Sequence, residues 1–481
     1  MNAASLPETT ALAGAAAISA LRQRLQQAHA TDLLPAAAVR AARLRRLQAL
    51  VDTEGPTLAQ AIAEDFSGRS LNEIRITEVM VLQAGLRDAL RHLAGWMKPR
   101  RVGVALAHLP GRARLMPQPL GVVGIVSPWN YPLLLSLGPL TGVLAAGNRA
   151  VLKPSELTPR FSAALVQAVA RHFAPDEVAV VTGDAEVGRA FVDQPWDHLV
   201  FTGSTAVGRQ VAQAAARHLT PVTLELGGKS PVIIDASCPL SPALMDRLAW
   251  GKLINAGQTC IAPDYLLVPR ARQAAVVEAL QAAMRRLYPR FLGNPDYTSI
   301  ISERHRQRLA GLVASAREQG ARVIELEADS ALAIGRQMAP VLLLDVHDDM
   351  PVMQDEIFGP LLPILPYDTL DDALAMIHRR ERPLALYWFG EDAAARERVL
   401  AGSLSGGVSI NDTLLHIAQD GLPFGGVGPS GMGHYHGEHG FRQFSKLKPV
   451  FLQSRWSAGG LIRPPYGPGL GRLLNWIGKL L

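Results

Sequence analysis

The stretch "HLVFTGSTAVGRQVAQAAARHLTPVTLELGG", residues 198–228, decides the fold of this chain. It begins with an apolar run of strand length, turns at a glycine and continues with apolar residues at helical spacing. A second apolar run then ends at two consecutive glycines. A strand, a helix and a strand in this order predict two parallel strands joined by a crossover helix, because parallel strands need a long connection.

The same alternation continues on both sides of this stretch. Upstream, strand-like runs begin near residue 121, and residues 11–100 carry apolar positions at the three- and four-residue spacing of helices. Downstream, a second series of strands and helices extends from about residue 230 to residue 412. These patterns predict an α/β protein with two parallel sheets, each covered by helices on both faces.

The composition limits the class of protein. A chain of 481 residues that is 48% hydrophobic and 19% charged is expected to be globular, with two or three domains. Two cysteines cannot form a disulfide framework, and no basic residue precedes the Ala-rich N-terminal run, so we expect no signal peptide and a cytoplasmic location. The net charge of +6 is spread over several segments, which argues against nucleic acid as a partner.

One uncharged segment, residues 115–148, has the hydropathy of a membrane span. Its prolines and the polar turn at Asn130 instead predict a buried strand, a turn and a buried helix. We therefore expect no transmembrane segment.

Two turns have the residue types that bind a dinucleotide. Gly203, Ser204 and Gly208 follow one predicted strand and open a helix, where backbone N–H groups can bind a diphosphate. Lys153 and Glu156 follow another strand, where an acidic residue commonly accepts a hydrogen bond from a ribose. The alternatives are an ordinary glycine-rich turn and a helix cap beside a solvated lysine. Only seven of the 48 basic residues are lysines, which makes Lys153 more informative.

Three further residues point to the chemistry of a carbonyl group. Cys260 is one of only two cysteines, and it is either a packing residue or a nucleophile. Glu225, in an otherwise apolar strand, is either a general base or the salt-bridge partner of Lys229. Asn130 either forms a turn or offers an amide donor to an oxyanion. With a dinucleotide fold, the set suggests a thiol that attacks a carbonyl while hydride passes to nicotinamide.

The chain resembles the aldehyde dehydrogenase superfamily from about residue 30 to residue 455. "CIAPDY" and "GMGHYHGEHGF" resemble its dimeric class-3 branch, and "NDTLLHIAQDGLPFGGVGPSGMGHYHG" is most similar to coniferyl aldehyde dehydrogenases. The motifs that carry the resemblance, in the family's order, are "PWNYP" at 128–132, "LKPSE" at 152–156, "FTGSTAVG" at 201–208, "LELGGK" at 224–229, "NAGQTC" at 255–260, "QDEIFGPLLP" at 354–363 and "LPFGGVGPSGMG" at 422–433.

The resemblance implies a role for each matching residue. Cys260 would form a thiohemiacetal and then a thioester, the amide of Asn130 would hold the oxyanion, and Glu225 would activate the water that releases the acid. The cofactor would be NAD, with NADP left open, because Glu156 should repel a 2′-phosphate that the neighbouring Lys153 could accept. The residues implied to bind the cofactor are Lys153 and Glu156 at the adenosine ribose, Gly203, Ser204 and Gly208 at the diphosphate, and Glu356 and Phe358 at the nicotinamide end.

The substrate implied by the resemblance is coniferyl aldehyde or a similar aromatic aldehyde. Medium- or long-chain aliphatic aldehydes are the alternative, followed by a CoA-acylating enzyme and by a catalytically silent dinucleotide-binding protein. Tyr131, Trp250 and His416 are candidate substrate contacts. The histidine-rich run 434–439 falls inside the class-3 motif, so we expect no metal there.

The resemblance also implies a domain organisation and a homodimer. The tail at 469–481 has one apolar face that would pack on the protein or, as a weaker alternative, lie on a membrane surface. The expected parts are a Rossmann-type cofactor domain at 1–103 and 122–228, a catalytic α/β domain at 229–420, bridging and oligomerisation segments at 104–121 and 421–455, and a tail at 456–481.

Overall fold

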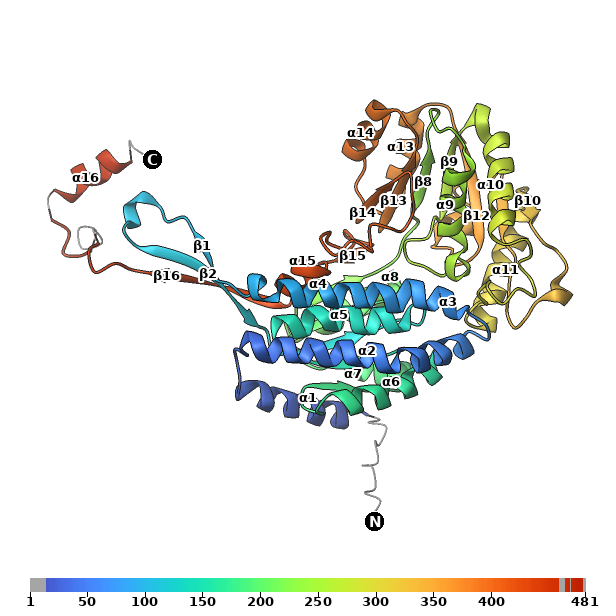
Figure 1. Cartoon of the computed structure of the whole chain (residues 1–481). Coiled ribbons are helices and arrows are strands. Elements are labelled where there is room, and N and C mark those ends of the chain that lie inside the picture. The colour runs from blue at the N-terminus through green and yellow to red at the C-terminus, as the bar shows by residue number, and fades with distance from the viewer. Residues whose placement is uncertain (1–13, 458–462, 468, 479–481) are drawn as a thin grey trace, which may run out of the picture.

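The computed structural model describes residues 14–457, 463–467 and 469–478. Two lobes and a projecting arm make up the molecule (Figure 1). The lower lobe contains a six-stranded sheet, the upper lobe a seven-stranded sheet and the arm a three-stranded sheet. The predicted α/β class is therefore confirmed.

The six-stranded sheet of the lower lobe has the order β15-β7-β6-β3-β4-β5. Its strands are parallel except for the short β15, which runs antiparallel to β7. The strands are β3 (Val122–Val126), β4 (Arg149–Lys153), β5 (Val178–Val180), β6 (His198–Thr202), β7 (Val222–Glu225) and β15 (Gly431–Met432).

Several helices of this lobe bury one apolar face. In α6, for example, Phe161, Leu165 and Val169 recur every four residues and all three are buried. The helices are α1 (Ala15–Ala30), α2 (Ala37–Asp65), α3 (Leu71–Ile74), α4 (Met80–Trp96), α5 (Pro132–Ala146), α6 (Pro159–His172), α7 (Ala185–Val192), α8 (Thr205–Ala216) and α15 (Gly437–Gln443), with a π-helical turn, η1 (Arg75–Val79), between α3 and α4.

The uncharged segment 115–148 forms β3 and α5, as predicted. Nearly all of α5 is buried, because the helix packs against α2, α4 and α15. Among the described residues, no helix combines the length and the apolar character that crossing a membrane requires.

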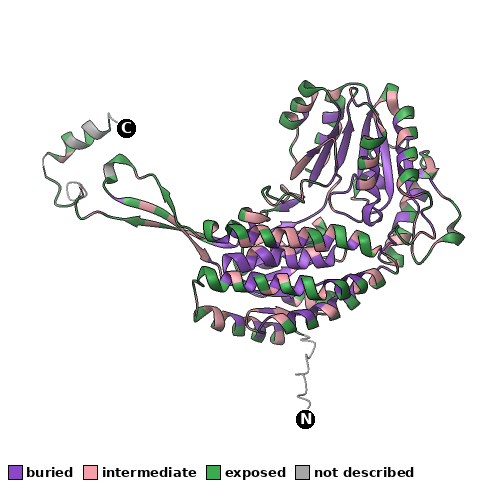
Figure 2. Ribbon diagram, in the orientation of Figure 1, coloured by how far each residue is buried: buried purple, intermediate pink, exposed green. Residues whose placement is uncertain are grey.

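The seven-stranded sheet of the upper lobe has the order β10-β11-β12-β9-β8-β13-β14. Only β10 is antiparallel to its neighbour. Its inner strands are buried, whereas the edge strands β10 and β14 and the outer faces of the surrounding helices are partly exposed (Figure 2). The elements are β8 (Pro231–Ile234), α9 (Pro242–Leu253), η3 (Ile254–Gly257), β9 (Tyr265–Pro269), η4 (Arg270–Arg272), α10 (Gln273–Leu287), α11 (Glu303–Glu318), β10 (Arg322–Glu325), η5 (Ser330–Leu332), β11 (Val341–Leu344), α12 (Pro351–Gln354), β12 (Leu361–Tyr367), α13 (Leu370–His378), β13 (Ala385–Phe389), α14 (Ala393–Gly402) and β14 (Gly407–Ile410).

The arm is an antiparallel sheet of β1 (Arg100–Val102), β2 (Arg112–Pro119) and β16 (Ser445–Leu452), with η2 (Leu106–His108) between the first two strands. Two predicted boundaries need correction. The arm already begins at Arg100, inside the segment assigned to the cofactor domain, because β1 pairs with β2. In addition, β15, which falls within the predicted bridging segment 421–455, pairs with β7 and belongs to the lower sheet.

The tail continues beyond the arm with α16 (Leu470–Ile477). Its predicted apolar face includes Leu480 and Leu481, which lie outside the described residues.

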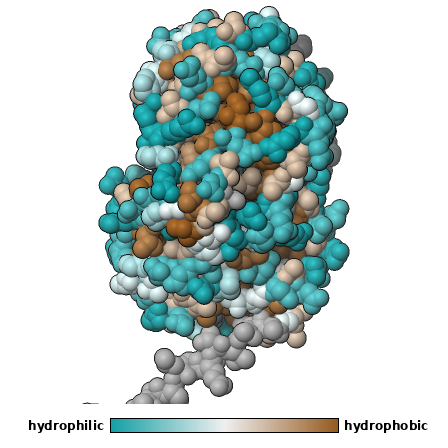
Figure 3. Space-filling model, turned by 90° about the vertical axis from the view of Figure 1, so that its right-hand side faces the viewer, coloured by the Kyte–Doolittle hydropathy of each residue, from teal (hydrophilic) through white to brown (hydrophobic). Residues whose placement is uncertain are grey.

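The side of the molecule that is turned to the viewer in Figure 3 is largely hydrophilic, with apolar side chains gathered mainly in its upper half.

The sheet register places the ends of several strands together. Val126 at the end of β3 pairs with Lys153 and with Phe201, and Thr202 pairs with Glu225. Because parallel strands end at the same edge, the turns that follow β3, β6 and β7 gather at one edge of the lower sheet.

Candidate active site

A cavity of about 770 Å³ lies between the two lobes. Its walls are the turns that follow β3, β6 and β7 in the lower lobe and the segments that precede β9 and β12 in the upper lobe. The carboxyl edge of one parallel sheet thus faces the amino edge of the other. The predicted residues that line this cavity are Asn130, Gly203, Ser204, Glu225, Cys260, Glu356 and Phe358.

Cys260 follows a turn with an uncommon backbone conformation. Asn255 has a φ of 51°, and Gly257 has a φ of 74°. A Cβ atom at Gly257 would lie 2.4 Å from the carbonyl oxygen of Gly359, so a side chain does not fit there. Left-handed conformations in non-glycine residues persist only where the surrounding structure fixes them, and they cluster at functional sites. The sequence "NAGQTC" therefore forms a rigid turn that presents the thiol.

Two carboxylates influence the thiol. Burial raises the pKa of Cys260, and the negative charges of Glu356 and Glu225 raise that pKa further. A thiol in such a setting is protonated at neutral pH, so it needs a base that removes its proton as it attacks. Cys260 is thus close to two groups that can accept a proton.

Asn130 lies on the turn between β3 and α5. Its side-chain Nδ2 donates to the carbonyl oxygen of Gln258 at 3.2 Å. Its own carbonyl oxygen accepts from Nη1 of Arg69 and from Nδ2 of Asn255, each at 2.9 Å. The Asn130 amide is therefore held against the turn that carries Cys260.

Glu225 is the last residue of β7, and only 2% of its surface is exposed. Neither of its carboxyl oxygens has a hydrogen-bond partner among the described residues. Burial consequently raises the pKa of Glu225 well above its ordinary value. The alternative of a salt bridge to Lys229 is wrong, because Lys229 pairs with Asp264. Glu225 is thus a desolvated carboxyl group with the properties of a general base.

Lys229 instead organises the upper wall of the cavity. Its Nζ also donates to the carbonyl oxygens of Val352 at 2.9 Å and Asp355 at 3.0 Å. The other oxygen of Asp264 accepts from the N–H of Ile357 at 2.9 Å. One buried ion pair therefore joins the segments that precede β8, β9 and β12.

Glu356 and Phe358 lie on the segment held in this way. Burial raises the pKa of Glu356 to about 8, and Oε1 of this residue has no partner among the described residues. A Cβ atom at Gly227 would lie 2.1 Å from Oε2 of Glu356, so that glycine permits the close approach. Phe358 packs edge-on against Trp129, with 5.3 Å between the ring centroids.

Gly203 and Ser204 line the cavity at the start of α8, where Ser204 Oγ caps the helix. The N-terminus of a helix favours an anion. Gly208 differs from the prediction, since its N–H already donates to the carbonyl of Ser204 at 2.9 Å. A Cβ atom at Gly208 would lie 2.5 Å from the side chain of Leu226, so this glycine serves the packing of α8 on the sheet.

Lys153 and Glu156 do not line the cavity. Lys153 is buried at the end of β4, and its Nζ donates to the carbonyl of Gly183 at 2.8 Å and to Glu156 at 3.4 Å. Lys153 and Glu156 form an ion pair in which the Glu156 side chain is about half exposed. Their predicted contact with a ribose stays a prediction.

The three candidate substrate contacts lie apart from this cavity. Tyr131 is buried, and its hydroxyl group shares a hydrogen bond of 2.7 Å with Thr259. Trp250 lines a separate hollow of about 180 Å³. His416 is bonded through Nδ1 to Ser409 at 2.9 Å and stacks on Phe424, while its Nε2 has no partner among the described residues.

Several residues of the site were missed by the sequence reasoning. These are the buried ions Arg69, Glu73 and Glu78 behind the cavity, and His305 and Arg308 in its wall. The signal for the first set was the four-residue spacing of Arg69, which lies just before α3, and Glu73, which lies within it. The described residues contain no cluster of three or more His, Cys, Asp or Glu that could hold a metal ion.

The donor set of the cavity fits a nicotinamide dinucleotide. The helix N-terminus at Gly203–Thr205 suits a diphosphate, and the unpaired Oε1 of Glu356 suits a ribose hydroxyl group. A cavity of this size between two α/β lobes, at the carboxyl edge of a parallel sheet, is the usual place for such a ligand.

Comparisons with known proteins agree with the fold. The model of the "Aldehyde dehydrogenase family" matches residues 3–450. A probable coniferyl aldehyde dehydrogenase of Pseudomonas aeruginosa is 51% identical over 95% of both chains. The coniferyl aldehyde dehydrogenase of a Pseudomonas species is 46% identical over 96% of both chains.

Solved structures agree as well. The substrate-bound state of Staphylococcus aureus AldH has a TM-score of 0.89 at 36% identity, covering 96% of this chain and 99% of that one. The NAD+ complex of a Mycobacterium tuberculosis aldehyde dehydrogenase has a TM-score of 0.81 at 29% identity, covering 92% and 91%.

Fold and comparisons together define an oxidoreductase. The chain belongs to the aldehyde dehydrogenase family, as the extent and identity of these matches show.

Proposed function

We propose that this enzyme oxidises coniferyl aldehyde or a similar aromatic aldehyde to the carboxylic acid, with Cys260 as nucleophile. The observation that carries the mechanism is the unpaired, buried carboxyl group of Glu225 in the cavity that Cys260 lines. The similarity to coniferyl aldehyde dehydrogenases supports the substrate class.

In the first step, the sulfur of Cys260 bonds to the aldehyde carbon, and the thiol proton passes to a neighbouring carboxylate, which releases it to solvent before the second step. The electron pair of the C=O bond moves to oxygen, and the amide of Asn130 with the N–H of Cys260 stabilises that oxyanion. When the C=O bond forms again, a hydride leaves the carbon and a thioester remains on Cys260. Bound nicotinamide dinucleotide supplies the acceptor for this hydride.

In the second step, Glu225 removes a proton from water, which attacks the thioester. The C–S bond breaks, the acid leaves, and the thiol regains a proton. A raised pKa suits Glu225 for this work, because a base is most effective when its pKa is near the working pH. The unpaired carboxyl group also counts against CoA as the acyl acceptor, since release to a thiol needs no water.

NAD is the proposed cofactor. NAD+ complexes of aldehyde dehydrogenases are among the structural relatives. In addition, the carboxylate of Glu156 beside Lys153 should disfavour a 2′-phosphate. We also propose a homodimer formed through the arm, and the two free cysteines agree with a reducing, cytoplasmic location.

The test is reduced-nicotinamide formation with coniferyl aldehyde and with a medium-chain alkanal, each with NAD and with NADP. Cys260→Ala should abolish turnover, and Cys238→Ala is the matched control, because Cys238 is a buried thiol outside the cavity. Turnover of the alkanal alone would keep the mechanism and contradict the substrate. Undiminished turnover by Cys260→Ala would contradict the mechanism.

A further inference from the structure

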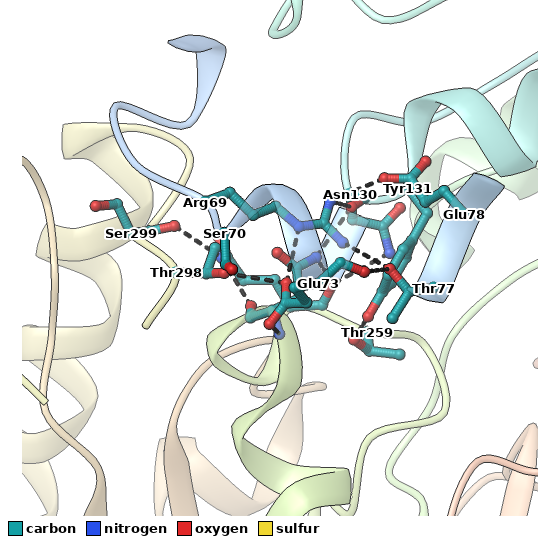
Figure 4. A network of polar contacts seen from close by, with 12 residues as sticks. Arg69, Ser70, Glu73, Thr77, Glu78, Asn130, Tyr131, Thr259, Thr298 and Ser299 are labelled. Atoms are coloured by element: carbon teal, nitrogen blue, oxygen red, sulfur yellow. Dashed lines mark hydrogen bonds and ion pairs between the residues drawn. The ribbon is translucent and has the colours of Figure 1, made fainter. Parts of the chain in front are cut away.

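Arg69 lies behind the active-site turns and is completely buried (Figure 4). Its Nε donates to Oε1 of Glu73 at 2.9 Å, and its Nη1 donates to Oε1 of Glu78 at 3.1 Å. The same Nη1 donates to the carbonyl oxygen of Asn130 at 2.9 Å. The planar fork of a guanidinium group can satisfy several acceptors in fixed directions. Arg69 uses that fork on two carboxylates and one carbonyl.

The two carboxylates continue the network to other parts of the site. Glu73 Oε2 accepts from the N–H of Asn255 at 3.1 Å, at the turn that leads to Cys260. Glu78 Oε2 accepts from the N–H groups of Leu133 at 2.9 Å and Leu134 at 3.1 Å, in the first turn of α5. Asn130, the first turn of α5 and the start of the Cys260 turn are therefore joined to one cation.

A second connection runs through Tyr131. The guanidinium carbon of Arg69 lies 4.7 Å from the centroid of the Tyr131 ring, which is a cation–π distance. The hydroxyl group of that ring is bonded to Thr259, the residue before Cys260. Arg69 thus contacts the Asn130 turn and reaches the Cys260 turn by two separate routes, through Glu73 and through Tyr131.

We propose that Arg69 is a positioning residue for the aldehyde dehydrogenase reaction, which fixes the amide of Asn130 relative to the thiol of Cys260. The inference rests on the proposed function, in which that amide stabilises the oxyanion. Oxyanion stabilisation depends on donors that are placed before the charge develops. The guanidinium group of Arg69 donates to the backbone carbonyl oxygen of Asn130. It thereby sets the orientation of Asn130, whose side-chain amide is the donor to the oxyanion.

A purely structural role is the competing explanation. Buried ion pairs often contribute little to stability compared with apolar residues of the same volume, although removal of one partner is costly. Arg40 provides a matched control, because it is also buried and donates to the carbonyl oxygens of Pro35, Ala145 and Ala146, and the two alanines lie at the end of α5 that is opposite to Asn130. Arg40→Lys should lower the melting temperature and leave kcat unchanged.

The experiment is a double-mutant cycle of Arg69→Lys with Asn130→Ala, measured with aldehyde and NAD at a temperature at which all variants are folded. Lysine keeps the charge and loses the fork. Removal of one oxyanion donor costs about 10²–10³-fold in kcat, which sets the upper limit for a residue that acts through it. We expect Arg69→Lys to lower kcat by about 10–100-fold with the KM for NAD unchanged, and by less than about threefold in the Asn130→Ala background.

Each outcome decides between the explanations. An Arg69→Lys enzyme with a lowered melting temperature and normal kcat would show that Arg69 is only structural. Equal losses in both backgrounds would show that Arg69 does not act through Asn130. Full activity of Asn130→Ala would instead overturn the proposed oxyanion role, independently of Arg69.

A second variant keeps the test decisive if Arg69→Lys does not fold. Glu73→Gln leaves Arg69 paired with Glu78, so no buried charge is left without a partner. It weakens the hydrogen bonds that residue 73 accepts from Arg69, Asn255 and Thr298. We expect a loss of kcat of about three- to tenfold, because a neutral acceptor forms the weaker hydrogen bond. An unchanged kcat for a folded Glu73→Gln enzyme would contradict the proposal.

Discussion

At the scale of single residues, the active site keeps groups that cost stability. Glu225 is buried with both oxygens unpaired among the described residues, and Glu356 has one unpaired oxygen. An ordinary core would not retain such carboxyl groups, because an unpaired buried polar group is destabilising. Their retention beside Cys260 is what an acid–base function would require.

Glu225→Gln should therefore stabilise the fold while it removes activity. The pKa of Glu225 in the folded protein lies above 4.5, its ordinary value, so the folded protein binds more protons than the unfolded chain as the pH rises from 4.5. The free energy of unfolding of the wild-type protein consequently falls as the pH rises above 4.5. We expect Glu225→Gln to raise the melting temperature more at pH 8 than at pH 5.

Thermal unfolding at both pH values measures this effect. Glu397→Gln is the control, because that side chain is 64% exposed and paired with Arg396. A Glu225→Gln protein that is less stable than the wild type at pH 8 would mean that the carboxylate has a partner in the folded state.

The sequence allowed the residues of the cavity to be predicted where each follows a recognisable strand and turn. Asn130 and Glu225 are of this kind, whereas Cys260 was predicted because it is one of only two cysteines and lies in the motif "NAGQTC". It could not show that the hydroxyl group of Tyr131 is already bonded, or that Lys229 pairs with Asp264, because these contacts join distant segments. Arg69 was missed although Glu73 lies only four residues further along the chain, because the contacts of Arg69 with Asn130 and Tyr131 form only in the folded chain.

At the scale of elements, parallel strands position the site and strained turns complete it. The turn at η3 is made by left-handed residues, and at Gly257 it leaves no space for a Cβ atom. The alternation of strands and helices predicted the sheets, because periodicity is a local signal. The antiparallel pairing of β15 with β7 was not predicted, since a two-residue strand has no periodicity.

Gly257→Ala should displace the turn that carries Cys260. The new Cβ would meet the backbone oxygen of Gly359 at 2.4 Å, and the left-handed φ adds strain of order 1–3 kcal/mol. We expect a lower free energy of unfolding and a large loss of kcat. Gly320→Ala is the control, with a φ of 94° and no atom within 4 Å, and it should lose stability but not activity. Equal kcat values for the two variants would contradict this role.

At the scale of the whole molecule, the packing of the described part of a single chain does not explain the exposed apolar surface of the arm. Its strands are mostly exposed or half-buried, and they project away from both lobes (Figures 1 and 2). A three-stranded sheet needs an apolar face that packs against something. Exposed apolar residues on the arm include Leu106, Leu109, Phe451 and Leu452. A second copy of the chain would cover them in the proposed homodimer.

Phe451→Glu with Leu452→Glu should therefore convert a dimer into monomers. Adjacent strand residues point to opposite faces, so the double variant charges both faces of β16. The mass in solution, from light scattering, is the measurement. Leu404→Glu, an equally exposed position in the upper lobe, is the control and should leave the mass unchanged. A wild-type protein that is monomeric at micromolar concentration would contradict the proposal.

The most direct test of the proposed mechanism is mass spectrometry of Glu225→Gln after incubation with coniferyl aldehyde and NAD. If Glu225 activates the water, this variant forms the thioester but releases it slowly. The predicted result is a mass gain of one acyl group, located on Cys260 and dependent on NAD. Rapid steady-state turnover without an adduct, or an adduct on another residue, would contradict the central claim.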